Sequence, residues 1–134
     1  QVMRTASGRI DGLTTDSLEI QVEDNATLQM TKLSTQRLES QVEGNATVSI
    51  SGNAGSQQIE VEDNAVYDAV QTESKTIDIQ AEDQSHSTVR FTDSLTGEVE
   101  DHAVVAYMTE SGSVSVSSED GGAVQQLPFE ALAS

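Results

Sequence analysis

The chain has 134 residues, of which 23 are Asp or Glu and only 6 are Lys or Arg, so its formal net charge at pH 7 is −17. A field this negative repels phosphate backbones, which argues against nucleic acid as a partner. No apolar run reaches the roughly 18–20 residues of a membrane-spanning helix, and a sequence without cysteine has neither disulfides nor thiolate chemistry. High charge with low hydrophobicity is typical of disorder, unless the acids recur regularly.

A hexapeptide recurs six times along the chain. Its copies are QVEDNA from Gln21, QVEGNA from Gln41, EVEDNA from Glu60, QAEDQS from Gln80, EVEDHA from Glu98 and SSEDGG from Ser117. Successive copies start 20, 19, 20, 18 and 19 residues apart. A partial copy is predicted at residues 2–6, where Met3, Arg4 and Thr5 replace the acidic trio. Its phase rests on spacings of 20 residues between Val2 and Val22, Ala6 and Ala26, Ile10 and Met30, and Leu13 and Leu33.

Apolar and polar residues alternate within every repeat, which is the period of a β-strand and not of a helix. Ser40 is an exception in the second coil, and a phase slip is predicted around His86. The expected inward residues, in chain order, are Leu18, Ile20, Val22, Ala26, Leu28, Met30, Leu38, Val42, Ala46, Val48, Ile50, Ile59, Val61, Ala65, Tyr67, Ala69, Ile77, Ile79, Ala81, Val89, Phe91, Leu95, Val99, Ala103, Val105, Tyr107, Val114, Val116 and Val124.

A repeat of about 19–20 residues with this period predicts one all-β domain, a single-stranded right-handed parallel β-helix over residues 1–134. Each coil would hold two or three short strands joined by tight polar corners. The coils are centred on residues 2–6 (partial), 21–26, 41–46, 60–65, 80–85, 98–103 and 117–122. Residues 127–134 contain the apolar segment LPFEAL, which is expected to cap the last coil or to form an oligomer contact.

The stretch from Ile50 to Ala106 resembles the autotransporter-adhesin, head-GIN domain family of bacterial secreted or envelope proteins. Tyr67, Asp68 and Ala69 stand at a Tyr-Asp-Ala step of that family, and its corners fall at the VEDNA copies. The likeness extends over roughly Leu18 to Leu127. Where the family has Ser-Gly corners, this chain has Glu-Asp in five copies and Glu43-Gly44 in one. The resemblance implies a single β-helix domain exported to the envelope, periplasm or cell exterior, and it implies no reaction.

The acidic corners are the strongest candidate site. Stacked coils would align their glutamates in one column and their aspartates in a second, interrupted by Gly44. The candidate ladder is Glu23, Asp24, Glu43, Glu62, Asp63, Glu82, Asp83, Glu100, Asp101, Glu119 and Asp120. With Glu19, Glu39, Glu60, Asp78 and Glu98 at neighbouring outward positions, sixteen of the 23 acids would share this edge. Lys32, Arg37, Lys75 and Arg90 map to the opposite end of the coil.

Carboxylates ~4.8 Å apart repel by roughly 1 kcal/mol per pair in water, so bound counterions are one way to stabilise the columns. Ca²⁺ prefers oxygen ligands such as these carboxylates and amides, and a weak calcium site is therefore one hypothesis. A solvated acidic face that confers solubility is the other. The nonapeptide motif of calcium-binding β-rolls is absent. No other cofactor is expected.

The register after the aspartates holds Asn25, Asn45, Asn64, Gln84, His102 and Gly121, and a structural amide ladder is predicted there. His86 and His102 form no zinc motif. The sequence favours a non-catalytic surface module that acts in adhesion to a protein or glycan partner. A cation-binding module is the alternative, and a glycan-acting enzyme is disfavoured because no long loop could build a cleft. End-to-end or edge association of copies is a further possibility.

Overall fold

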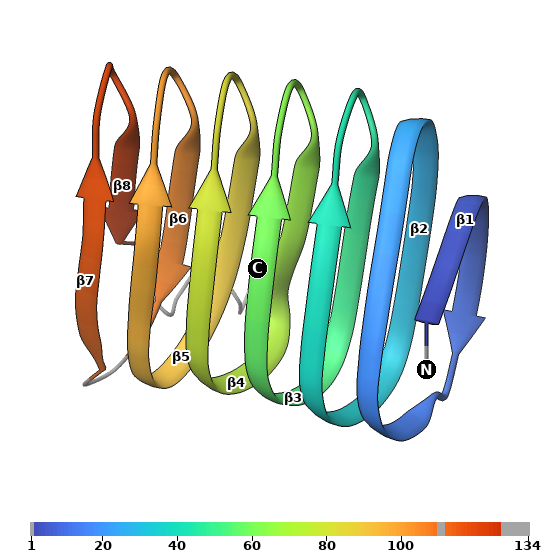
Figure 1. Ribbon diagram of the computed structural model, residues 1–134. Helices are drawn as coiled ribbons and strands as arrows, with labels where there is room; N and C mark the ends of the chain where they lie inside the picture. The colour runs from blue at the N-terminus through green and yellow to red at the C-terminus, as the bar shows by residue number, and fades with distance from the viewer. Residues whose placement is uncertain (1, 110–111, 127–134) are drawn as a thin grey trace.

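The computed structural model describes residues 2–109 and 112–126, and in this part of the chain it contains strands and no helix (Figure 1). The strands are β1 (Val2–Asp11), β2 (Thr14–Val42), β3 (Thr47–Val61), β4 (Val66–Ala81), β5 (His86–Val99), β6 (Val104–Met108), β7 (Ser113–Ser118) and β8 (Ala123–Gln126). Every pairing is parallel, in the order β1–β2–β3–β4–β5–β6–β8 with β7 beside β5. The chain is a β-solenoid of about six turns, which confirms the predicted parallel all-β fold.

Each coil has two sides that meet at the acidic corner and at a second, broader turn, the far bend (Figure 1). A single strand spans most of a coil: β4 runs from one corner to the next without a break. The prediction of two or three short strands per coil was therefore wrong for the coils of β3, β4 and β5, whereas the coil between the corners at residues 98–103 and 117–122 has two short strands, β6 and β7. The far bend curves through register shifts, such as the one between Ala69 and Glu73, and needs no turn that interrupts the strand.

The alternating apolar residues fill the interior between the two sides. Residues from Leu18 in β2 to Val105 in β6 form one continuous buried cluster, in which Tyr67 and Phe91 are the largest side chains. The last coil is less covered, since Val114 is 38% exposed where an inward position was predicted. No further coil among the described residues lies over it. The predicted cap at residues 127–134 lies outside the described residues.

A buried polar chain crosses the interior and accounts for the exception at Ser40. The Tyr67 hydroxyl donates to Gln57 Oε1 at 2.8 Å and lies 3.2 Å from Ser40 Oγ, while Gln57 Nε2 donates to Ser74 Oγ at 2.6 Å. All four side chains are buried, and burial raises the pKa of Tyr67. Because each polar group has a partner, the solenoid accommodates a tyrosine in an otherwise aliphatic interior.

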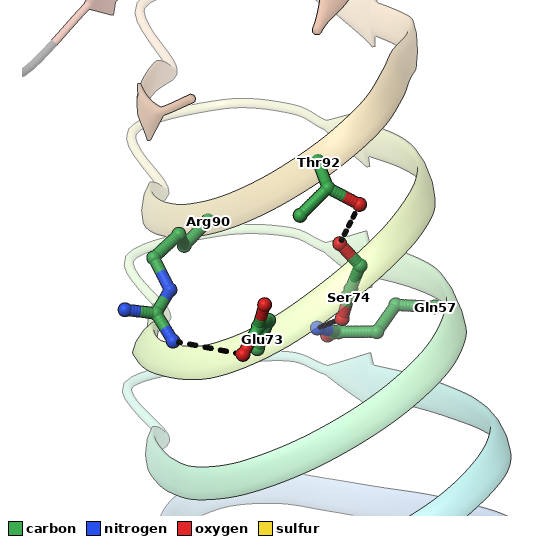
Figure 2. A network of polar contacts seen from close by, with 5 residues as sticks. All are labelled: Gln57, Glu73, Ser74, Arg90 and Thr92. Atoms are coloured by element: carbon green, nitrogen blue, oxygen red, sulfur yellow. Dashed lines mark hydrogen bonds and ion pairs between the residues drawn. The ribbon is translucent and has the colours of Figure 1, made fainter. Parts of the chain in front are cut away.

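The far bend carries the basic residues and their few polar contacts (Figure 2). Ser74 connects the interior to this bend: its side chain accepts the Gln57 bond, and its carbonyl accepts a 3.4 Å bond from Thr92 Oγ1. Arg90 Nη2 lies 3.8 Å from Glu73 Oε2 in the preceding coil. A long ion pair with one exposed partner contributes little to stability.

The register of the first coil differs from the predicted one. Thr5, and not Val2, pairs with Val22, and Val2 pairs with Glu19. One residue separates Thr5 from Ser7 in the first coil, whereas four residues separate their partners, Val22 and Thr27, in β2. The first coil therefore lacks a full corner. Met3, Arg4 and Thr5 consequently do not stand opposite the acidic trio. The later part of the prediction is confirmed, because Ile10 pairs with Met30.

The phase slip predicted around His86 is also absent. Tyr67 pairs with Ser87 and Ala69 pairs with Val89 in an unbroken register, and His86 is exposed. Two inward positions of this coil are occupied by serines. Ser85 stands at the corner position that other coils fill with Ala65 and Ala103, and Ser87 pairs with Tyr67.

Replacing Ser85 by alanine should stabilise the solenoid. Ser85 Oγ is buried and has no hydrogen-bond partner among the described residues, and a buried unpaired hydroxyl costs about 1–3 kcal/mol. We expect Ser85→Ala to raise the free energy of unfolding by about 1 kcal/mol in urea titrations. Ser40→Ala is the matched control, since it removes a bonded hydroxyl and should lower stability. Equal destabilisation by both variants would contradict the prediction.

Candidate interaction surfaces

Each acidic corner has a residue with a positive φ after its glutamate, and from residues 41–46 onward the corner is a tight turn between strands, whereas β2 runs through the corner at residues 21–26. The Ala65 amide donates to the Glu62 carbonyl, and equivalent bonds close the next two corners. The φ value is 63° at Asp24, 73° at Gly44, 61° at Asp63, 61° at Asp83, 58° at Asp101 and 52° at Asp120. Asp and Gly adopt this conformation at lower cost than other residues do. The Asp-or-Gly column therefore has a backbone cause, independent of any ligand.

The aspartate carboxylates also bind the backbone of the preceding coil. Asp63 Oδ2 accepts a bond of 3.1 Å from the Gly44 amide, and Asp83 Oδ2 accepts one of 3.3 Å from the Asp63 amide. Bonds from amides to ionised carboxylates are stronger than neutral ones. This contact offsets part of the repulsion within the column, and it makes these aspartates structural.

The glutamates form the predicted column, since the amides of Glu43, Glu62 and Glu82 bond in turn to the carbonyls of Val22, Val42 and Val61. Partial burial and the neighbouring carboxylates, Glu43 and Glu82 foremost, raise the pKa of Glu62. Burial and the carboxylates of Glu82 and Glu98 raise the pKa of Glu100 in the same way. The glutamate column is thus under mutual repulsion.

The two columns do not converge on a point. No group of three or more His, Asp or Glu side chains among the described residues lies close enough to hold one metal ion. A shallow hollow of about 350 Å³ follows the corner instead, lined by Asp63, Asn64, Asp83, Gln84, Asp101 and His102. Calcium binding by the candidate ladder remains a prediction.

The amide register shows one of its predicted side-chain bonds, from Asn45 Nδ2 to Asn25 Oδ1 at 3.2 Å. Backbone bonds hold the rest of the corner together: the Asn64 amide donates to the Gly44 carbonyl and the Gln84 amide to that of Asp63. His86 Nδ1 lies 3.1 Å from the Gln84 carbonyl. His102 stands in the next corner, and His86 pairs with Val104, two residues after it.

The side of the solenoid that leads into the corners is acidic (front row of arrows in Figure 1). We call it the acidic face, with the outward carboxylates Glu19, Glu39, Glu60, Asp78 and Glu98. Glutamines stand beside them and bond from coil to coil: Gln21 Nε2 donates to Gln41 Oε1 at 3.3 Å, and Gln41 Nε2 to Glu60 Oε2 at 3.5 Å. This face extends the charge of the corner columns.

The opposite side, which follows each corner, is nearly uncharged. We call it the neutral face, and its outward residues are Thr27, Gln29, Thr47, Ser49, Val66, Asp68, His86, Thr88, Val104, Ala106, Ala123 and Gln125. In the six coils that supply these residues Asp68 is the only carboxylate, and the first coil adds Arg9 and Asp11, which pair with Gln29 and Thr31. Val66, at 38% exposure, is one of the most exposed large apolar side chains. This face was not predicted from the sequence, because only the positions of the acidic residues were considered. The uncharged outward positions after each corner are nevertheless visible in the repeat.

A sequence model of the family described as "Putative auto-transporter adhesin, head GIN domain" matches residues 3–111. The chain belongs to this family. The match covers most of the chain and agrees with the resemblance seen at the corners and at the Tyr67 step. No significant match to the chain was found among curated proteins or among solved structures. Among the described residues there is no helix that is long and apolar enough to cross a membrane.

Replacing Asp83 by alanine should destabilise the corner. The change puts a Cβ-bearing residue without local hydrogen-bonding capacity at φ 61° and removes the acceptor for the Asp63 amide. We expect Asp83→Ala to cost about 1–2 kcal/mol in urea unfolding, and Asp83→Asn to cost less. Asp78→Ala removes the same charge from an extended strand position on the acidic face. An equal effect of both alanine variants would contradict the structural role of Asp83.

Replacing Glu62 by glutamine should stabilise the protein at pH 7. Its raised pKa means that the folded state binds the proton more tightly than the unfolded chain, so the ionised carboxylate disfavours folding above that pKa. We expect Glu62→Gln to gain about 0.2–1 kcal/mol at pH 7. The gain should vanish as the pH falls through the raised pKa, and it should shrink in 1 M salt. Asp16→Asn, outside the columns, should give no such gain; a pH-independent difference would contradict the repulsion.

Proposed function

We propose that the chain is a non-catalytic, exported module of the cell surface or envelope that binds a partner through its neutral face. The observation that carries the proposal is the unequal charge of the two faces in a member of an adhesin-named family. A contact surface with few charges can be covered without leaving ionised groups desolvated. The acidic face and corners would keep the remaining surface soluble and repel other acidic surfaces.

The form of the surface supports binding over catalysis. The glutamates stand along an open edge, where water reaches them, and no described loop encloses them in a cleft. General acid–base catalysis needs a positioned pair of groups against a bound substrate. The flat ladders instead present equivalent groups from coil to coil, which suits recognition of an extended surface.

Adhesion can be tested by displaying the chain on a non-adherent bacterium. We expect at least tenfold more cells than an empty-display control to remain on one of three surfaces: animal-cell layers, matrix proteins or immobilised neutral glycans. Thr47→Glu with Thr88→Glu places two charges on the neutral face and should abolish retention. Gln58→Glu with Thr96→Glu adds the same charge to the acidic face and should preserve it.

No retention on any surface, or equal loss with both pairs of substitutions, would overturn the proposal. Antibodies to the chain should label intact source cells if the module is exported to the outer surface. A calcium titration by calorimetry at constant ionic strength tests the cation-binding alternative separately. A binding isotherm that the ladder variant Glu62→Gln weakens would support that alternative instead.

A further inference from the structure

A hollow of about 270 Å³ lies on the neutral face where it approaches the far bend. Four successive coils contribute polar side chains to it: Arg9 from β1, Gln29 and Thr31 from β2, Ser49 from β3, and Asp68 and Gln71 from β4. Its volume is close to the lower limit of small-molecule sites, about 300 Å³. The hollow is remote from the acidic corners and was not foreseen from the repeat.

The hollow lies where the coil-to-coil register changes. Thr27–Met30 pair in sequence with Thr47–Ile50, but the register then shifts between Met30 and Leu33. The next coils shift between Ser49 and Ser51 and between Ala69 and Glu73. Lys32, the inserted residue of the first shift, has a φ of 56° and is the only described residue other than Asp or Gly with a positive φ. Such bulges and outliers redirect side chains and cluster at binding sites.

The lining combines donors and acceptors without excess charge. The side-chain amides of Gln29 and Gln71 and the hydroxyl of Ser49 can each donate and accept, Arg9 donates, and Asp68 accepts. Asp68 is held in place by a 3.3 Å bond from the Val70 amide to its Oδ1. The Thr31 hydroxyl is engaged by Asp11 Oδ1 at 2.8 Å. Arg9 has no ion pair among the described residues.

This chemistry selects one class of ligand. The net charge of −17 disfavours anions, and cations would be drawn to the acidic edge. An apolar peptide would find little to cover, because the apolar lining consists of Met30 and Ile50, only 1% and 2% exposed, and the half-buried Val70. Neutral sugars carry many hydroxyl groups that both donate and accept, which matches amide and hydroxyl side chains.

We infer that this hollow binds a short neutral oligosaccharide through Arg9, Gln29, Ser49, Asp68 and Gln71. The inference rests on the proposed function, for which it supplies the ligand class and the site. Because the contacts come from four coils, the ligand would lie across the strands, and a di- to tetrasaccharide would engage more of them than a single sugar.

The test is an array of neutral di- to tetrasaccharides, with sialylated and sulfated glycans printed beside them, probed with the purified full chain. We expect binding to a neutral member, and at least tenfold weaker binding by the double variant Gln29→Ala with Gln71→Ala. Gln58→Ala with Gln80→Ala removes two exposed glutamines of the acidic face, outside the hollow, and should bind as the parent does. Circular dichroism melting of all three proteins separates loss of binding from loss of fold.

Three results would overturn the inference: no neutral glycan bound, preference for anionic glycans, or unchanged affinity of the Gln29/Gln71 variant. The display experiment keeps these results distinct from failure of the proposed function. Adhesion of cells to matrix protein through the neutral face, without glycan binding, would support the proposed function and contradict the sugar site. Glycan binding at the hollow without adhesion of cells would support the sugar site and contradict the adhesive function.

Discussion

Parallel stacking of coils is the constraint on which this structure depends. Hydrogen bonds between equivalent strands fix each coil roughly 4.8 Å from the next, so any residue type that recurs in the repeat becomes a continuous column. Inward columns of Val, Ile, Leu and Ala make an interior that is buried from Leu18 to Val105. The same geometry aligns the outward residues, so like charges that recur in the repeat must also stand beside one another on the surface.

The acidic corner shows how the solenoid tolerates that consequence. Its second residue needs a positive φ, which favours Asp or Gly, and the Asp carboxylate then accepts an amide of the preceding coil, as Asp63 does from Gly44. The aspartates therefore combine a backbone requirement with a stabilising bond. Among the described residues, Glu62 and Glu100 accept no such bond from a backbone amide, and burial together with repulsion from neighbouring carboxylates raises their pKa values.

Sixteen of the 23 acidic residues lie along one edge and one face, so the molecule has two unlike surfaces. The acidic face continues the corner columns through Glu39, Glu60 and Asp78, whereas the neutral face carries only Asp68 besides the Arg9 and Asp11 of the first coil. Register shifts at the far bend open a polar hollow in this second surface. Recognition by the neutral face and solubility from the acidic one are compatible roles for a member of this family.

The sequence by itself determined the coil, its length and the two acidic columns. Apolar and polar residues alternate within a repeat of about 19 residues, and strands of this kind bury their apolar side only when equivalent residues of successive coils are stacked. It also placed most of the interior, including Tyr67 and Phe91. It could not determine the register of residues 2–6, where a shortened corner makes Thr5 the partner of Val22. Nor could it show that Ser85 and Ser87 point inward without a slip. Those features, the polar chain around Tyr67 and the hollow at the far bend depend on contacts between coils, which a repeat pattern does not specify.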